Sequence, residues 1–190
     1  MIACLHYKLG SGAVQIYLTP PLAFIIPGME YDLSALPVTN CKTIPPEYID
    51  IMGHMNVMWY IHIFDYGTRS LFDSFGFGEE YVRRTGMGSF ALDSHIRYLG
   101  EVRLGESVTV RSRLLDRSAK TLHFIHFMTR DHDGELSATI EVLAAHADLT
   151  LRKVTPFPPE VLAQLDPLLA AHQRLPWDAP LSGCISVRKK

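Results

Sequence analysis

Alternating apolar and polar side chains predict most of the secondary structure of this chain. A short alternating stretch at 38–44 indicates a strand, and four longer extended stretches follow in the second half of the sequence. Only short turns separate these four stretches, so we expect them to form an antiparallel meander. In order they are 89–99, 107–115, 122–130 and 137–152, and Asp133-Gly134 is the turn into the last.

A nearly continuous apolar run at 57–64 interrupts the strand pattern and predicts a helix. We expect this helix to span 57–75, with Asn56 at its N-cap and Gly76 just past its C-terminus. Because the run is apolar on nearly every face, its first half should be buried and only its second half should emerge toward solvent. A buried helix placed ahead of a meander predicts an α+β domain, in which a curled antiparallel sheet wraps around a long central helix.

The segments before and after this domain show a weaker pattern of apolar and polar residues. We divide the chain into a leader at 1–29, a domain at 30–158 that includes a short helix at 79–84, and a C-terminal helix with an irregular tail at 159–190. The leader is nearly uncharged, and prolines break its apolar run, so it fits neither a membrane span nor a signal peptide. We expect it to be a poorly structured extension, or translation to begin at Met29.

Charge and cysteine content exclude several classes of protein. The 18 Lys and Arg against 20 Asp and Glu give a net charge of -2, which argues against a nucleic-acid partner. Three scattered cysteines, never in a CxxC pair, argue against a disulfide scaffold and favour a cytoplasmic location. His123 and His126 lie three apart on a predicted strand and should point to opposite faces, so we expect no metal site.

The candidate chemistry lies in the loop before the central helix. Asp50, His54 and Asn56 accompany Gly53 there, immediately ahead of the expected helix start. Free amides and the positive end of the helix dipole suit an anion or a developing oxyanion. A carboxylate at that place can attack a carbonyl or deprotonate a water. The same residues also allow a purely structural interpretation, in which Asn56 caps the helix, Asp50 binds loop amides and His54 packs.

The spacing Asp50-x3-His54-x-Asn56-x3-Tyr60 resembles the signature of hotdog-fold acyl-CoA thioesterases of the 4-hydroxybenzoyl-CoA thioesterase-like family. The resemblance covers about 38–158 and also touches the betainyl-CoA and carnitine-related branch. It implies the hotdog fold and hydrolysis of an acyl-CoA to free acid and coenzyme A. It implies no cofactor beyond the coenzyme A of the substrate. It further implies a homodimer or dimer of dimers with active sites at the subunit interface.

The resemblance also assigns roles to residues. Asp50 matches the main catalytic residue, as nucleophile or general base, while His54 and Asn56 match positions that shape the loop and orient substrate or water. Amides from about Val57 onward would polarise the thioester carbonyl. Val57 itself stands where many relatives have a second asparagine. Apolar helix residues could line an acyl pocket or simply fill the core. The substrate-binding candidates are Gly53, Val57, Met58, Trp59, Tyr60, Phe64, Asp65 and His126.

Two other functions fit the same sequence. One is a lyase of the same fold, an enoyl-CoA hydratase or dehydratase, for which Asp50 and His54 would be the acid and histidine pair. The other is a non-catalytic module that binds acyl-CoA. In either case the phosphates of coenzyme A need cations. Two clusters offer them: Arg111, Arg113, Arg117 and Lys120 in one, Arg152 and Lys153 in the other.

Overall fold

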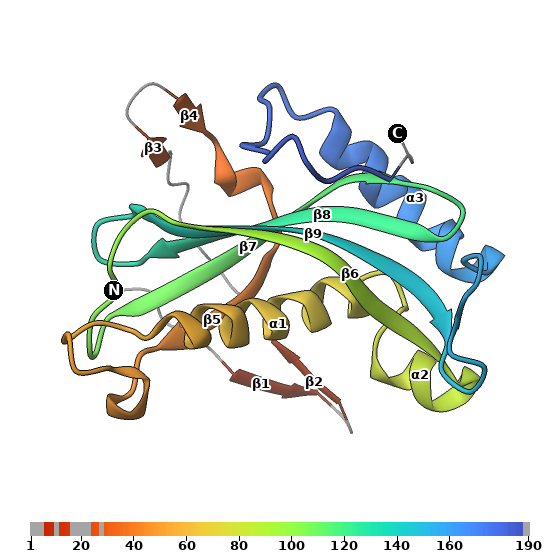
Figure 1. The fold of residues 1–190 in the computed structure, drawn as a ribbon, viewed down its shortest axis with the longest axis horizontal. Helices are drawn as coiled ribbons and strands as arrows, with labels where there is room; N and C mark the ends of the chain where they lie inside the picture. The colour runs from red at the N-terminus through yellow and green to blue at the C-terminus, as the bar shows by residue number, and fades with distance from the viewer. Residues whose placement is uncertain (1–5, 10–11, 16–23, 27–28, 188–190) are drawn as a thin grey trace.

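The fold is a single curled antiparallel sheet with a long helix on its concave side, as the sequence predicted. The computed structural model describes residues 6–9, 12–15, 24–26 and 29–187. Helix α1 (Val57–Asp73) lies along the concave side of the sheet (Figure 1). Helix α3 (Pro159–Gln173) packs on β7 (Ser107–Arg117), and its buried residues belong to the same apolar core as those of α1. The α+β class of the prediction is therefore confirmed.

The order of strands in the sheet is β6-β9-β8-β7-β5, and every pairing is antiparallel. A two-residue strand, β10, pairs with the end of β9. The expected meander is correct for β7 to β9 and wrong for β6, which pairs with β9 instead of β7. The strands are β5 (Val38–Thr43), β6 (Met87–Tyr98), β7 (Ser107–Arg117), β8 (Thr121–Arg130), β9 (Leu136–Asp148) and β10 (Lys153–Val154).

Burial explains the position of β6. Most side chains of β7, β8 and β9 are buried, as suits central strands, whereas most side chains of β6 are exposed, as suits an edge. The connection at 99–106 therefore carries the chain past two strands. The predicted strand at 137–152 is also too long. Asp148 Oδ1 accepts hydrogen bonds from the amides of Thr150 and Leu151, and this turn ends β9.

Helix α1 begins and ends close to the predicted positions, and Asn56 caps it as predicted. The expectation of a wholly buried first half is wrong, because Val57, Met58 and Ile61 are each more than half exposed. The face toward the sheet consists of residues three or four apart, as in any amphipathic helix. These buried residues are Tyr60, Ile63, Phe64, Gly67, Leu71 and Phe72.

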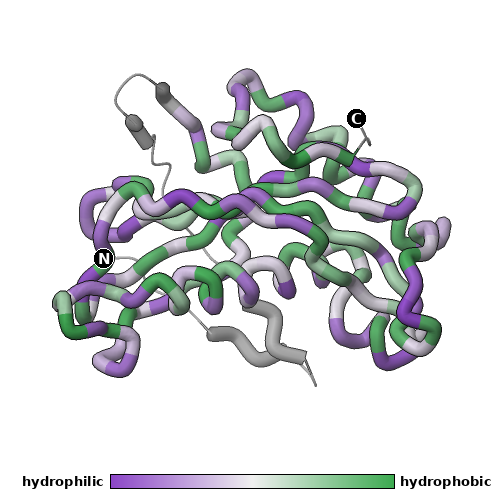
Figure 2. Tube along the Cα trace, viewed as in Figure 1, coloured by the Kyte–Doolittle hydropathy of each residue, from purple (hydrophilic) through white to green (hydrophobic). Residues whose placement is uncertain are grey.

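Gly67 lets α1 approach the sheet closely. A β-carbon at this position would lie 3.1 Å from Val110 Cγ1 of β7 and 3.3 Å from Thr39 Oγ1 of β5. The core between α1 and the sheet is apolar and rich in aromatic side chains. Figure 2 shows the apolar positions that run through α1 and the strands. The close packing fixes α1, and with it the loop at its start, relative to the sheet.

The C-terminal tail covers the outer, convex face of the sheet. Trp177 packs against Phe127 of β8 and against Tyr31, and the Arg113 guanidinium lies 4.2 Å from the Trp177 ring. Further along, Ser182 N donates to Glu141 Oε2, and Glu141 is paired with His123 in a buried contact of 2.8 Å. His123 and His126 do point to opposite faces of β8, as predicted.

Short elements complete the described part of the chain. In the leader, β1 (His6–Leu9) pairs with β2 (Gly12–Gln15), and β3 (Phe24–Ile26) pairs with β4 (Met29–Tyr31). The other residues of 1–29 lie outside the described ones, so the expectation of a poorly structured leader stays a prediction. Helix α2 (Glu79–Thr85) ends at Gly86 in the left-handed conformation. None of the described helices is long and apolar enough to cross a membrane.

Candidate active site

A tight loop presents Asp50 at the start of α1. Ile49 and Met55 form an isolated antiparallel bridge, and between them Asp50 N donates to His54 O and Gly53 N donates to Asp50 O. Gly53 has φ +84, and a β-carbon there would meet nothing within 4 Å. This glycine is therefore required by backbone conformation and not by lack of space.

The carboxylate of Asp50 has defined partners. Met52 N donates to Asp50 Oδ1 at 2.8 Å, and Asn56 Nδ2 lies 3.5 Å from Oδ2. His54 Nδ1 lies 3.9 Å from Oδ1, too far for a hydrogen bond. The side chain of Asp50 is 15% exposed and that of His54 is 26% exposed, so the carboxylate is accessible but partly withdrawn from water.

Asn56 joins Asp50 to the helix start. Its Oδ1 accepts from Met58 N at 3.1 Å, and its carbonyl oxygen accepts from Trp59 N at 3.0 Å. Val57 N–H has no acceptor within the described part of the chain, so it is the free amide of the first turn. We had expected several free amides at the helix start to polarise the carbonyl. Only that of Val57 is free, because the amides of Met58 and Trp59 donate to Asn56. A carboxylate and a free amide are held next to each other by one side chain.

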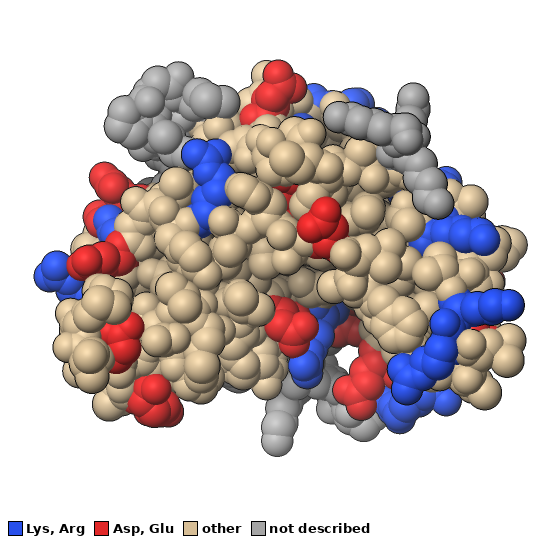
Figure 3. Space-filling view, in the orientation of Figure 1, with Lys and Arg blue, Asp and Glu red and all other residues tan. Residues whose placement is uncertain are grey.

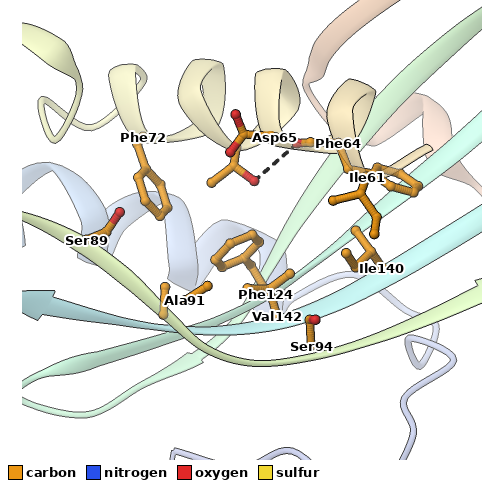
Figure 4. A pocket seen from close by; sticks show the side chains of 12 residues that line it. Ile61, Phe64, Asp65, Phe72, Ser89, Ala91, Ser94, Phe124, Ile140 and Val142 are labelled. Carbon is orange, nitrogen blue, oxygen red and sulfur yellow. Dashed lines mark hydrogen bonds between the residues drawn. The ribbon is translucent and has the colours of Figure 1, made fainter. Parts of the chain in front are cut away.

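A cavity of about 280 Å³ lies further along α1, between this helix and β6. The ring of Phe72 points from α1 toward the sheet, and Phe124 of β8 meets it with ring centroids 5.7 Å apart (Figure 4). Ser94 lines the cavity from β6. The α1 side is formed by Ile61, Phe64, Asp65, Thr68 and Phe72. The cavity begins one helical turn after Val57, and it does not include Asp50.

The remaining candidates are distributed around these two places. Tyr60 lies with His54 and Val57 in a shallow hollow bounded by the end of β6. Burial raises the pKa of Tyr60, whose hydroxyl donates to Gly100 O. Trp59 is stacked on Tyr48, with ring centroids 3.8 Å apart, and lines none of these spaces. Met58 is exposed. Phe64 and Asp65 line the cavity, and Asp65 also forms an ion pair with Arg69.

His126 lies directly behind the cavity wall and is completely buried. Its Nε2 is 2.9 Å from Thr68 Oγ1, and its Nδ1 is 2.6 Å from Ser112 Oγ. Burial lowers the pKa of His126 to about 3, so the ring is neutral at physiological pH. His126, a substrate-binding candidate from the sequence, thus packs in the core and contacts a residue of the pocket.

The cationic clusters are not equivalent. Arg111 and Arg113 are buried on the outer face, where they donate to the carbonyl oxygens of Leu36 and Trp177, and Arg117 is paired with Asp166. The three arginines of that cluster therefore have partners within the protein, and only Lys120 is exposed. Figure 3 shows other basic side chains gathered near α2 and the end of β9. Among the described residues, no group of three His, Cys, Asp or Glu gathers as in a metal site.

Sequence reasoning missed most of the cavity. Ile61, Thr68 and Phe72 were not singled out, although they follow Val57 at helical spacing on one face of α1. That spacing is the signal that could have identified them. Ser94 could not have been identified, because the pairing of β6 with β9 is what brings it opposite α1. Phe124 lies on β8, and its place opposite α1 depends on how the whole sheet packs on the helix.

Comparison with known proteins identifies the class. The thioesterase-like superfamily matches residues 44–165. A Staphylococcus aureus protein solved in complex with CoA has a TM-score of 0.71 and 25% identity, over 80% of this chain and 97% of that one. A putative thioesterase of Pseudomonas putida has a TM-score of 0.66 and 28% identity, over 82% and 97%. The fold is therefore the hotdog fold of thioesterases, as the resemblance implied.

Curated relatives of known activity are also similar to this chain. The betainyl-CoA thioesterase of Pseudomonas aeruginosa is 34% identical over 76% of this chain and 91% of its own length. The L-carnitine dehydrogenase/betainyl-CoA thioesterase of Rhizobium meliloti is 35% identical over 70% of this chain, which spans about a quarter (26%) of that longer protein. The chain belongs to the thioesterase-like superfamily and is a thioester hydrolase.

Proposed function

We propose that this protein hydrolyses an acyl-CoA thioester to a free acid and coenzyme A, with Asp50 as the catalytic carboxylate. The observation that carries the proposal is the arrangement at the start of α1, where Asn56 contacts Asp50 and leaves Val57 N–H free. The free amide donates to the thioester carbonyl oxygen and stabilises the negative charge that develops on it. Asp50 attacks the carbonyl carbon or removes a proton from the attacking water, and the thiol of coenzyme A leaves.

The reaction requires no separate cofactor, because water, one carboxylate and one amide supply all its parts. His54 lies too far from Asp50 to act as its hydrogen-bond partner, so its role is to shape the hollow beside Val57. Tyr60 forms another wall of this hollow.

We place the active site between two copies of the chain. No described strand pairs with the outer edge of β6, and exposed apolar residues of α1 lie on the flank of the molecule beside it. Two copies joined antiparallel through β6 across a twofold axis would also bring their α1 helices antiparallel. The start of one α1, with Asp50, would then approach the cavity of its partner. This explains why Asp50 and the cavity are separate within one chain.

The acyl group is proposed to be short and to carry a quaternary ammonium, as a betainyl group does, because curated relatives are named betainyl-CoA thioesterases. The cavity supports this choice. Phe64, Phe72 and Phe124 line it, and aromatic faces attract a desolvated cation with about 0.5 to 2 kcal/mol each.

The test is a panel of acyl-CoAs assayed for thiol release with the full chain and with Asp50→Asn. We expect the substitution to lower kcat at least about 100-fold, which is the scale for loss of a positioned acid or base. Glu47→Gln is the matched control, because it removes the same charge from an exposed position three residues earlier. Full activity in Asp50→Asn contradicts the mechanism. Loss of an enoyl chromophore without thiol release indicates the hydratase instead, and binding without turnover indicates an acyl-CoA-binding module.

A further inference from the structure

A chain of hydrogen bonds crosses the core and ends at the cavity. Thr39 Oγ1 lies 2.6 Å from Ser112 Oγ, which lies 2.6 Å from His126 Nδ1. On the other side of the imidazole, Nε2 lies 2.9 Å from Thr68 Oγ1, and Thr68 lines the cavity. The two ends of the chain are backbone oxygens: Thr39 Oγ1 is 3.4 Å from Val110 O, and Thr68 Oγ1 is 3.2 Å from Phe64 O.

Counting protons shows what Thr68 offers to the cavity. If the neutral imidazole carries its proton on Nε2, it donates to Thr68, and the Thr68 hydroxyl donates to Phe64 O. If the proton is on Nδ1, the imidazole donates to Ser112, and Thr68 donates to Nε2. In both tautomers the protein supplies an acceptor for the single Thr68 proton, Phe64 O in the first and His126 Nε2 in the second. With that proton directed inward, the Thr68 oxygen can offer only lone pairs to a group in the cavity.

His126 also supports the rest of the wall. Its ring is stacked with Phe64, at 5.9 Å and 16°, and meets Phe124 edge to face at 5.2 Å. Three residues that line the cavity are thus held by one side chain that does not line it itself. Because His126 is fully buried and bonded at both nitrogens, it has one orientation and cannot turn toward the substrate.

We propose that Thr68 is a specificity-determining residue of the acyl cavity and that His126 is the positioning residue which keeps the Thr68 proton turned away from the substrate. The inference rests on the proposed function. A cavity wall that offers only hydrogen-bond acceptors favours an acyl group with positive charge or polarised C–H groups. It disfavours an acyl group whose oxygens need a hydrogen-bond donor. The carboxylate of Asp65 next to Thr68 on α1 has the same acceptor-only character.

Two substrates of equal shape test this assignment. Betainyl-CoA carries a trimethylammonium, and 3,3-dimethylbutanoyl-CoA replaces its nitrogen by carbon without charge. For the full chain we expect betainyl-CoA to have the higher kcat/KM. Thr68→Val preserves shape and removes the oxygen, and we expect it to lower the ratio of the two kcat/KM values about tenfold, because kcat/KM falls more for betainyl-CoA than for the neutral substrate. Thr68→Ser retains the hydroxyl and should retain the ratio.

Variants of His126 test the positioning role separately. His126→Leu frees the Thr68 hydroxyl and should lower the same ratio at least threefold, whereas His126→Gln can still bond Thr68 and should keep it. Thermal melting confirms that each variant is folded, and the Thr68 variants decide the question if His126→Leu does not fold. An unchanged ratio in Thr68→Val overturns the inference but leaves the hydrolase intact. The inference is also overturned if the protein hydrolyses other acyl-CoAs but neither of these two substrates. If no acyl-CoA gives thiol release, the proposed function is overturned as well.

Discussion

At the residue scale, His172 of α3 is a buried histidine whose neutral form is part of the fold. Its Nδ1 accepts a hydrogen bond from Leu114 N at 2.9 Å, where β7 has an irregular register. Burial, and then the positive charge of Arg113, lower the pKa of His172 to about 4. A protonated ring would have no lone pair on Nδ1 for the Leu114 amide.

This pKa predicts how stability depends on pH. An unfolded chain has a histidine pKa of about 6.5, so between pH 6.5 and 4 it binds more protons than the folded chain. The stabilisation by neutral His172 is complete above pH 6.5 and is lost as the pH falls, by about 2 kcal/mol at pH 5. In His172→Asn, which keeps an acceptor, the decrease in unfolding free energy from pH 7 to pH 5 should be smaller by about this amount.

Urea unfolding at both pH values and one protein concentration measures this difference. Gln173→Asn is the control, because the side chain of Gln173 also bonds the backbone of β7 but does not titrate, so the stability of this variant should decrease as that of the natural chain does. His126 has a pKa lowered to about 3 and remains in all three proteins, so its contribution cancels in the comparison. The same decrease in His172→Asn as in the natural chain would show that the interpretation is wrong.

The candidate site was only partly predictable at this scale, for a physical reason. Capping is local, so the sequence identified Asn56 at the helix start, and this structural interpretation is confirmed, while its catalytic role stays a prediction. It caps α1 through Oδ1 and contacts Asp50 through Nδ2. Helical spacing could have placed Thr68 on the cavity face of α1, but its bond to His126 could not be predicted, because His126 lies 58 residues away in the sequence.

At the element scale, the tail after α3 acts as a cover for the sheet. Trp177 is its main anchor, since it contacts Tyr31, Phe127 and Arg113 on the outer face. We expect Trp177→Ala to lower the free energy of unfolding by about 1 to 3 kcal/mol, because it removes a large aromatic contact from a half-buried position. The activity should stay unchanged, since the tail and α1 lie on opposite faces of the sheet (Figure 1).

Denaturant unfolding and thiol-release assays of the same preparations measure both effects. Leu181→Ala is the control from the same tail, because this leucine is largely exposed. Loss of activity with unchanged stability in Trp177→Ala would contradict a covering role and connect the tail to the site.

The predictability of elements follows the range of the interactions that define them. The ends of α1 and α2 were predicted within two residues because Asn56 and Gly86 act on their own neighbours. The partner of β6 was predicted incorrectly, since alternation shows that a segment is a strand and not which strand it pairs with. The exposed apolar residues of α1 were predicted to be buried in the core. An apolar pattern in the sequence does not distinguish a residue of the core from an apolar residue at the surface.

At the scale of the whole molecule, two faces of the sheet have different roles. The tail covers the convex face, so that face is not free for a second copy. The edge of β6, with which no other described strand pairs, and the adjacent exposed residues of α1, which include Ile61, remain for assembly. A long uncovered edge strand of this kind is favoured to pair with another copy across a twofold axis. We therefore expect a dimer through β6 as the active form.

Leu92 tests this assembly, because it projects from β6 and is 51% exposed in the single chain. Leu92→Asp should leave the fold intact but place a charge in the joined edge, which is unfavourable when buried. We expect the mass in light scattering to fall from twice the 21.4 kDa of one chain to that of one chain, with thiol release lost in parallel. Leu104→Asp makes the same change at a 56% exposed position outside the strands and should remain an active dimer. A fully active monomer of Leu92→Asp would place the complete site within one chain.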